Sequence, residues 1–301
     1  MKILITGGSG LVGSKLTEML TDKGIAVVWL GRKAGVKNGI VCYKWDYKTN
    51  YIDKKAFEGV THVIHLAGAG VFDKRWSESY RKEIYDSRIK TTELLVQHIS
   101  EIPQLKAFIG GSAIGIYGNS LQTTLLDETA RSGNDFLAKV TVDWENAALA
   151  FEQSNIRTVT IRIGIVLAKE GGALEAITKP IKLYVGSPLA TGEQIISWIH
   201  IEDLCNIFIK AIEDENMKGV YNGVAPTPVS NKVFTKAAAT ILKRPLLLPN
   251  VPAFVLNIVL GNQKACSVVE GIPVSALKIQ HAGLKFRYPT IESALSNLLL
   301  I

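Results

Sequence analysis

The chain has 301 residues, of which 47% are hydrophobic and 20% are charged, and its formal net charge is +7. This balance is typical of a folded protein with a sizeable core and excludes an intrinsically disordered chain. The Lys and Arg residues are scattered, without the basic stripe that binds a polyanion, so no nucleic-acid partner is expected.

The first predicted element is a strand over 2–6, which runs through a glycine-rich turn into a helix over 11–23. Gly7 allows a sharp bend, Gly10 lets the backbone approach a pyrophosphate, and Gly13 lets the helix pack closely on the strand. The helix N-terminus offers free N–H groups and a positive dipole to phosphate. This order predicts a dinucleotide site that includes Gly7, Ser9, Gly10, Leu11, Val12 and Gly13.

Strand and helix patterns then alternate along the chain. Strands are expected at 26–30, 40–44, 62–67, 107–112 and 158–167, with helices over 77–100 and 135–153. The strands are short and rich in Val and Ile, as in a sheet covered on both faces. The alternation predicts an α/β fold with a doubly wound parallel Rossmann sheet.

The regular alternation stops after residue 167. The next predicted elements are a helix opening at 171–172, a strand over 195–199, a helix over 202–213 and a strand over 219–222. Helices follow at 231–242, 253–260, 274–281 and 290–300. We therefore expect a Rossmann domain over 1–167 that returns at 195–222. A smaller, mostly helical C-terminal and substrate lobe is expected from 168–194 and 223–301.

The most apolar stretch, Pro245–Gly261, is interrupted by three prolines and is too short for a membrane span. It favours a packed or interface helix over contact with a membrane surface. The first residues form a strand and not a signal peptide, and the three cysteines lie far apart. These features predict a cytoplasmic protein with no membrane partner and no metal site.

The end of the second strand distinguishes NAD from NADP. Enzymes that bind NAD usually place an acid there to accept from the ribose 2′-hydroxyl. Here Gly31 is followed by Arg32 and Lys33, without an acid. Arg32 is placed to bind a 2′-phosphate and Lys33 adds charge, although a solvated basic pair is the alternative. The predicted cofactor is NADP.

Other residues follow strands whose carboxyl ends should meet at the same edge of the sheet. Asp46 is a candidate acceptor for the adenine amino group, and the small residues after the fourth strand would allow close approach of the adenosine half; these are Leu66, Ala67 and Gly68. Arg75 and Arg88 would receive an anionic substrate or the cofactor phosphates. The alternative for them is an ion pair, for example with Asp86.

Together, residues 6–13, 46, 66–68, 112 and 198–203 resemble the extended short-chain dehydrogenase/reductase superfamily. Further motifs resemble its atypical epimerase-family branch, whose members are named nucleoside-diphosphate-sugar epimerases or SulA-like cell-division inhibitors. These motifs lie at 73–76, 86–92, 135–137, 143–145, 162–167, 171–174, 225–229 and 283–289. The resemblance spans essentially the whole chain.

The resemblance implies a Tyr-x-x-x-Lys pair on the helix after the fifth strand, with a Ser that polarises the substrate oxygen. The Ser is present as Ser112. Aligned on Glu145, however, Leu137 stands in the place of the Tyr and Thr141 in the place of the Lys. Arg88 falls where the superfamily has an Asn that supports this Lys.

The candidate catalytic residues that remain are Ser112, as a hydrogen-bond donor, and Tyr117. Their alternative roles are holding a loop for Ser112 and forming a pocket wall for Tyr117. Lys139 is expected to face solvent. The resemblance also implies that the nicotinamide lies against the strand edge at 162–167, which adds Ile165 to the cofactor residues.

Two functions stay open. One is an NADP-dependent oxidoreductase or nucleotide-sugar epimerase that lacks the Tyr-x-x-x-Lys pair and acts on a small-molecule substrate, nucleotide-linked or anionic. The other is a non-catalytic NADPH-binding sensor or regulatory protein, for example in cell division. A homodimer is left open.

Overall fold

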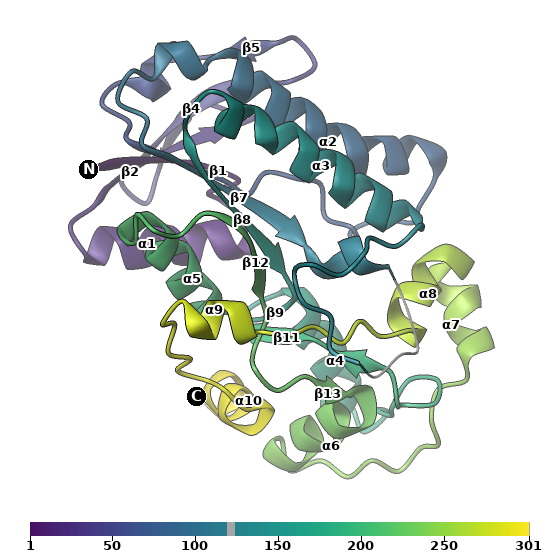
Figure 1. The fold of residues 1–301 in the computed structure, drawn as a ribbon. Helices are drawn as coiled ribbons and strands as arrows, with labels where there is room; N and C mark the ends of the chain where they lie inside the picture. The colour runs from purple at the N-terminus through teal and green to yellow at the C-terminus, as the bar shows by residue number, and fades with distance from the viewer. Residues whose placement is uncertain (119–123, 301) are drawn as a thin grey trace. The chain divides into compact units, whose positions relative to one another are not determined.

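The computed structural model describes residues 1–118 and 124–300, and the chain divides into two compact units (Figure 1). Unit 1 comprises Met1–Ala113, Lys139–Arg162 and Cys205–Tyr221. Unit 2 comprises Ile114–Ala138, Ile163–Leu204 and Asn222–Ile301. The chain therefore passes repeatedly between the units.

Unit 1 is built on a sheet that has nine strands in the described part of the chain, in the order β12-β8-β7-β6-β1-β2-β4-β3, with β5 beside β4. The strands are β1 (Lys2–Thr6), β2 (Ala26–Gly31), β3 (Gly35–Lys37), β4 (Ile40–Asp46), β5 (Tyr51–Ile52), β6 (His62–His65), β7 (Ala107–Ala113), β8 (Arg157–Ile163) and β12 (Gly219–Gly223). The helices are α1 (Leu11–Asp22), α2 (Glu78–Gln97), α3 (Phe136–Gln153) and α5 (Ile201–Glu213), with short 3₁₀ turns η1 (Lys54–Phe57) and η2 (Ile99–Glu101).

The predicted doubly wound parallel sheet is confirmed. Strand β1 runs parallel to β2 and β6, β6 parallel to β7, and β2 parallel to β4. Two short strands, β3 and β5, were not predicted, and both run antiparallel to β4. Strands β3 and β4 form a hairpin through Asn38 and Gly39, which both have positive φ. An Asn-Gly pair is typical of such a turn, so the sequence did indicate this hairpin.

Helices cover both faces of this sheet, as Figure 1 shows for α2 and α3 on one face and α1 and α5 on the other. Tyr85 of α2 donates a hydrogen bond to Asp143 of α3 at 3.0 Å, and Lys23, just after α1, pairs with Glu213 of α5 at 2.9 Å. Beneath α2 and α3 the core includes the stacked rings of Phe108 and Phe151, 4.0 Å apart. Burial of large apolar side chains such as these stabilises the unit.

Unit 2 has its own core and two small two-stranded sheets. Its strands are β9 (Ile165–Leu167), β10 (Ile195–Ile196), β11 (Trp198–His200) and β13 (Val229–Ser230). Strand β9 pairs with β11 in parallel and β10 with β13 in antiparallel fashion. Its helices are η3 (Ile114–Tyr117), α4 (Gly172–Lys182), α6 (Asn231–Ile241), α7 (Ala253–Leu260), α8 (Asn262–Val269), α9 (Leu277–His281) and α10 (Ile291–Leu299).

The single strand predicted over 158–167 is wrong, because the chain breaks at Gly164 into β8 and β9. The Gly164 N–H donates to the Gly223 carbonyl at 3.1 Å, and a Cβ at Gly164 would lie 2.6 Å from the Ser197 carbonyl oxygen. Glycine at this position permits the close backbone approach at which β9 joins β11. The strand predicted over 195–199 likewise divides into β10 and β11. The helix predicted from 274 begins only at Leu277, since Val274 is bridged to Leu126.

The motif at 198–203 fastens the C-terminal segment within unit 2. The buried Asp203 carboxylate accepts the backbone N–H groups of Arg287 (2.8 Å) and Tyr288 (2.9 Å). The His200 ring lies 3.8 Å from that of Tyr288, and its Nε2 is 3.1 Å from the Asn297 amide oxygen. Burial raises the pKa of Asp203 and lowers that of His200. These residues of the family motif therefore have a structural role here.

Unit 1 holds a buried histidine whose charge state should make stability depend on pH. His65 Nδ1 lies 2.7 Å from Thr6 Oγ1, Nε2 lies 3.1 Å from Thr92 Oγ1, and burial lowers the pKa of His65 to about 3. Unfolding then takes up a proton at any pH between about 6.5 and 3, so stability present above pH 6.5 is lost as pH falls.

We predict that replacing His65→Gln reduces the slope of the free energy of unfolding against pH by up to about 1.4 kcal/mol per pH unit below pH 6. Urea unfolding at a series of pH values from 7 to 4.5 measures this slope for both proteins. Equal slopes in the wild type and the variant would show that His65 is not neutral in the folded state.

Candidate functional site

The turn between β1 and α1 is shaped by close backbone contacts. Gly7 has φ +70°, and a Cβ there would lie 2.8 Å from the Leu66 carbonyl group. The Gly10 N–H donates to the Gly7 carbonyl at 3.0 Å, and a Cβ at Gly13 would overlap that same carbonyl. Only glycine fits at Gly7 and Gly13, so the bend and the close helix packing expected from the sequence are confirmed as conformations.

The N-terminus of α1 has the properties of an anion site. Among the described residues no side chain caps this helix, whose N-cap is the exposed Gly10. The first N–H groups of a helix lack partners within the helix and carry the positive end of its dipole. The missing Cβ atoms and the uncapped N–H groups fit the pyrophosphate of a dinucleotide, which residues 7–13 would hold.

The carboxyl ends of β1 and β6 are joined by one threonine. Thr6 Oγ1 accepts the backbone N–H groups of Leu66 and Ala67, each at 3.2 Å, and also lies against His65. The predicted adenosine-side residues Leu66 and Ala67 are thereby held beside the glycine turn, as their sequence position suggested. The sequence did not predict that Thr6 and His65 support these residues, because a Thr-Gly pair at a strand end does not indicate such a contact.

The predicted 2′-phosphate residues lie at the end of β2. Arg32 and Lys33 are exposed, and neither has an ion pair with another described side chain. Lys44 stands opposite Gly31 on the neighbouring β4 and adds a third exposed cation at this edge. Asp46, at the end of β4, accepts the Lys48 N–H at 2.9 Å with one carboxylate oxygen. The other oxygen of Asp46 keeps acceptor capacity, so its adenine contact stays a prediction.

A fixed loop follows β6 at the same edge of the sheet. The Ala69 N–H donates to Ser87 Oγ at 2.9 Å, and the Tyr80 hydroxyl donates to the Gly70 carbonyl at 2.6 Å. Arg88 donates from one nitrogen to the carbonyls of Ala69 and Ile84, both at 3.0 Å. Asp86 pairs instead with Lys82 and Lys90, so it is not the partner of Arg88.

Arg88 is therefore a support of the loop in addition to its predicted cofactor role, which stays a prediction. Its guanidinium lies against Gly68 and 5.2 Å from the Trp144 ring centroid, and burial lowers its pKa to about 10. It stays charged at neutral pH. Arg75, farther along the same loop, is exposed and has no ion pair with another described side chain.

Ser112, near the end of β7, belongs to a buried charged cluster that sequence reasoning did not assemble. Its hydroxyl donates to Glu145 Oε1 at 2.6 Å. Arg162 of β8 donates to both oxygens of the same carboxylate, each at 2.9 Å. A serine hydroxyl has one proton, so Ser112 would have to leave Glu145 to donate to a substrate, whereas its lone pairs remain available.

A signal for this cluster was present in the sequence. Arg162 is the one charged residue within the strand predicted over 158–167, and a buried arginine needs a carboxylate partner. Glu145, on the helix that precedes this strand, had been used only as an alignment landmark. Its fixed place on α3 leaves Thr141 buried one turn earlier and Leu137 half-buried a further turn earlier.

The hydroxyls of Tyr117 and Tyr85 both donate hydrogen bonds to other side chains. In unit 2 the buried Tyr117 hydroxyl donates its proton to the Asn222 amide oxygen at 2.7 Å. The catalytic role of Tyr117 stays a prediction. In unit 1, burial and the neighbouring Asp143 raise the pKa of Tyr85. Lys139 is exposed, as expected, and lies 3.3 Å from Asp143. Ile165, half-buried on β9 in unit 2, keeps its predicted nicotinamide role as a prediction.

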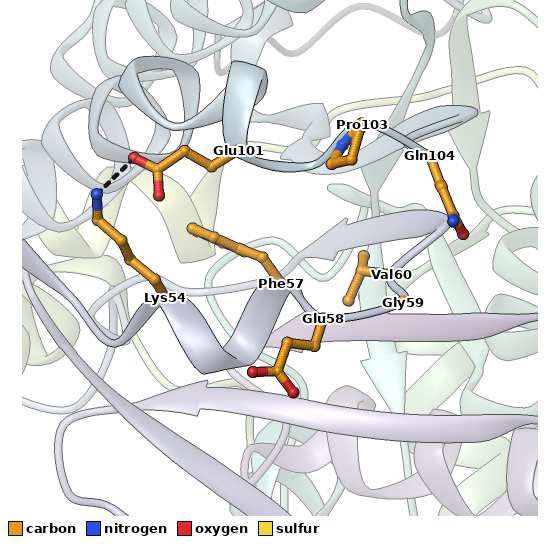
Figure 2. A pocket seen from close by; sticks show the side chains of 8 residues that line it. All are labelled: Lys54, Phe57, Glu58, Gly59, Val60, Glu101, Pro103 and Gln104. Carbon is orange, nitrogen blue, oxygen red and sulfur yellow. Dashed lines mark ion pairs between the residues drawn. The ribbon is translucent and has the colours of Figure 1, made fainter.

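A surface hollow of about 230 Å³ lies at the opposite edge of the unit 1 sheet. Its lining residues precede β6 and β7, and Figure 2 shows Lys54 and Glu101 facing each other across it at 2.9 Å. The glycine turn instead follows the carboxyl end of β1, where ligands of such sheets bind. This hollow is therefore separate from the predicted cofactor site.

Two further observations concern metals and membranes. Within residues 1–118 and 124–300, no group of three or more His, Cys, Asp or Glu side chains is arranged to hold a metal ion. None of the helices in the same ranges combines the length and the apolar character that crossing a bilayer requires.

Comparison with known proteins agrees with this geometry. A model of the NAD dependent epimerase/dehydratase family matches residues 3–222, and a model of a domain of unknown function, DUF1731, matches residues 251–298. The chain is 36% identical over 304 residues to the epimerase family protein YfhF of Bacillus subtilis, covering 99% of this chain and 98% of that protein. It is 32% identical to human epimerase family protein SDR39U1, covering 99% of each.

Solved structures give the same assignment. The crystal structure of human SDR39U1 (isoform 2) with NADPH superimposes with a TM-score of 0.88 at 31% identity, covering 99% of both chains. A nucleoside-diphosphate sugar epimerase from Corynebacterium glutamicum gives 0.80 at 31% identity, covering 99% of this chain and 58% of that one. UDP-glucose 4-epimerase of Thermus thermophilus, at 18% identity and a TM-score of 0.76, shares the fold.

The sheet of unit 1 and the glycine turn after β1 together define a Rossmann-fold protein of the short-chain dehydrogenase/reductase type. The chain belongs to the NAD dependent epimerase/dehydratase family, in the branch of epimerase family proteins that includes SDR39U1 and YfhF. The resemblance to that branch in the sequence is thus confirmed.

The buried cluster gives a stability prediction. Replacing Arg162→Met should destabilise unit 1 by about 3–5 kcal/mol, because it leaves the Glu145 carboxylate buried without its cation. Ser112→Ala should have a smaller effect of about 1.5–3 kcal/mol, the range for a hydrogen bond to a charged group. Urea unfolding measures both losses.

Lys139→Met is the matched control, because it removes an exposed ion pair on the same helix and should change stability by less than about 1 kcal/mol. If Arg162→Met were no more destabilising than this control, the cluster would not be a structural support.

Proposed function

We propose that the protein binds NADPH in preference to NADH. The observation that carries the proposal is the exposed pair Arg32 and Lys33 at the end of β2, where no acid stands to accept from a ribose 2′-hydroxyl. The uncapped α1 N-terminus and the glycine turn support binding of the pyrophosphate. The relative solved with NADPH, human SDR39U1, supports the same cofactor.

We further propose that the protein is an oxidoreductase or epimerase of altered proton chemistry. The bound cofactor would supply a hydride as NADPH in a reduction, or accept a hydride as NADP⁺ and return it in an epimerisation. Ser112, held by Glu145, would orient the ligand by accepting a hydrogen bond from a substrate hydroxyl or an amide, and not by donating one. A proton for the reaction would come from water, the substrate or another side chain, because Leu137 and Thr141 take the places of the Tyr and Lys.

The substrate class that the chain supports is small and anionic, with nucleotide-linked sugars included. Arg75 is exposed on a loop that Ser87, Arg88 and Tyr80 hold at the carboxyl edge of the unit 1 sheet. A guanidinium on a fixed loop suits bidentate binding of phosphate or carboxylate.

A second function, a non-catalytic NADPH sensor or regulator, is favoured by the same departures on α3. Leu137 and Thr141 cannot lower the pKa of a tyrosine, and the Tyr117 and Tyr85 hydroxyls already donate to Asn222 and Asp143. A protein of this kind would keep the nucleotide site and show no turnover.

Cofactor preference is testable at Arg32. Arg32→Ala should weaken NADPH binding by about 1.5–3 kcal/mol, roughly 10- to 150-fold, because a charge-assisted hydrogen bond to the 2′-phosphate is lost. NADH binding should be nearly unchanged. Titration of nucleotide fluorescence measures both affinities, and equal losses for the two nucleotides would rule out Arg32 as the 2′-phosphate ligand.

Gly10→Val tests the turn itself. Gly10 has φ −80°, which valine adopts, and a Cβ there would lie 3.2 Å from the Gly7 carbonyl oxygen, so the fold should persist after a small local shift while the new side chain occupies the approach of the pyrophosphate. Binding of both nucleotides should be abolished in a variant that remains folded. A folded variant that still binds NADPH would show that the turn has no more than a structural role.

Turnover is the third test. We expect slow NADPH oxidation across a panel of carbonyls and sugar nucleotides, about 10²–10⁴-fold below relatives with full acid–base assistance. Rates are compared for the wild type, Ser112→Ala and Tyr117→Phe. Fast turnover that collapses in Tyr117→Phe would contradict the proposal, because a displaced tyrosine would then supply the proton. Epimerisation consumes no NADPH, so it is followed separately by NMR of the sugar nucleotides. Absence of both NADPH oxidation and epimerisation, with NADPH binding intact, would favour the sensor.

A further inference from the structure

Exposed large apolar side chains gather on one part of unit 2 that the proposed function does not use. We define this apolar surface by seven residues, each between 48% and 74% exposed: Leu183, Tyr184, Val185, Leu247, Leu248, Phe254 and Ile258. Isolated exposed apolar residues are common, but a group of this kind indicates an interaction site.

The segments that carry these residues run side by side. The Val251 N–H donates to the Pro188 carbonyl at 2.9 Å, and Leu189 is bridged to Val251. The Arg244 guanidinium lies 4.8 Å from the Tyr184 ring centroid. Helix α7 begins two residues after Val251, so Phe254 and Ile258 follow this paired segment directly along the chain.

Helix α7 presents an apolar side chain on successive turns. Its sequence, AFVLNIVL, has no charged residue, and Phe254 and Ile258 lie four positions apart on one face, 64% and 74% exposed. Among the described elements α7 packs chiefly against α8, and Figure 1 draws the two helices together at the margin of unit 2. The exposed face therefore belongs to a peripheral helical hairpin.

Basic residues border the apolar surface on both segments. Lys179 and Lys182 precede Leu183 along the chain, while Lys243 and Arg244 precede Leu247. Acids on either side of Lys179 and Lys182 along the chain are Glu175, one turn before Lys179 on α4, and Glu193, which lies 3.7 Å from Lys232. A second copy of the chain packed face to face would bring two basic borders together, which disfavours a self-contact.

We propose that this apolar surface docks on a bilayer that contains anionic lipids. A planar surface accepts a peripheral hairpin without a facing wall, its acyl region takes up Phe254 and Ile258, and its headgroups pair with the bordering cations. The sequence alone favoured a packed or interface helix for 245–261 and no membrane partner. The exposure of these side chains in the fold changes that prediction. The membrane proposal does not depend on the proposed NADPH chemistry.

The experiment is sedimentation of the full chain with vesicles of phosphatidylcholine alone or with phosphatidylglycerol added. We expect binding to the anionic vesicles that weakens with salt, and little binding to the neutral ones. Phe254→Ser and Ile258→Ser should each lower the partition coefficient by about tenfold, the scale for one large apolar side chain. Lys182→Gln and Lys243→Gln should each lower it by about fivefold.

Val36→Ser and Lys37→Gln, on the exposed β3 of unit 1, are matched controls and should leave partitioning unchanged. Melting temperature and NADPH titration establish that each variant is folded. Absence of binding to anionic vesicles, or equal loss in the controls, would overturn the proposal. So would a dimer in analytical ultracentrifugation that Ile258→Ser converts to monomer, because a second copy would then cover the surface.

Discussion

The pairing of the Glu145 carboxylate with two guanidinium nitrogens of a buried arginine is the interaction on which the centre of unit 1 depends. It connects α3 to β8 through Arg162 and to β7 through the hydroxyl of Ser112. Two buried charges are tolerated only when they are paired with good geometry, so the three residues are constrained as a set. The same constraint directs the Ser112 proton to Glu145 in this structure. We propose that Ser112 therefore accepts a hydrogen bond from the ligand, where the family resemblance implies a serine donor.

A second constraint acts at the nucleotide turn, where backbone atoms lie too close for side chains. A Cβ at Gly7 would meet the Leu66 carbonyl group and a Cβ at Gly13 would meet the Gly7 carbonyl group, while Thr6 joins the ends of β1 and β6 through its hydroxyl. The turn is therefore shaped by the packing of unit 1 itself. We propose that cofactor selectivity depends on the exposed end of β2, which can change without disturbing that packing. Such a separation would allow one fold to be found with NAD in UDP-glucose 4-epimerase of Thermus thermophilus and with NADPH in human SDR39U1.

Local patterns predicted much of this fold. The glycine turn, the parallel strands and helices α1, α3 and α7 follow from short-range spacing, and their residues lie where expected. The break at Gly164 could not be predicted, because it depends on Ser197 and Gly223, which are distant in sequence. The candidate site divides in the same way. The exposed basic pair Arg32 and Lys33 could be predicted from its position after the second strand. The partner of Ser112 could not be predicted without knowing which acid faces Arg162. The exposure of α7 likewise depends on what the rest of unit 2 leaves uncovered.

A neutron crystal structure of the protein with NADPH tests both proposals most directly, because it locates the proton of Ser112 and the 2′-phosphate together. We predict that Arg32 contacts the 2′-phosphate, that the pyrophosphate lies on the N–H groups at 10–13, and that the Ser112 proton still points to Glu145. A 2′-phosphate away from Arg32, or a Ser112 hydroxyl turned from Glu145 to donate to the ligand, would contradict this prediction.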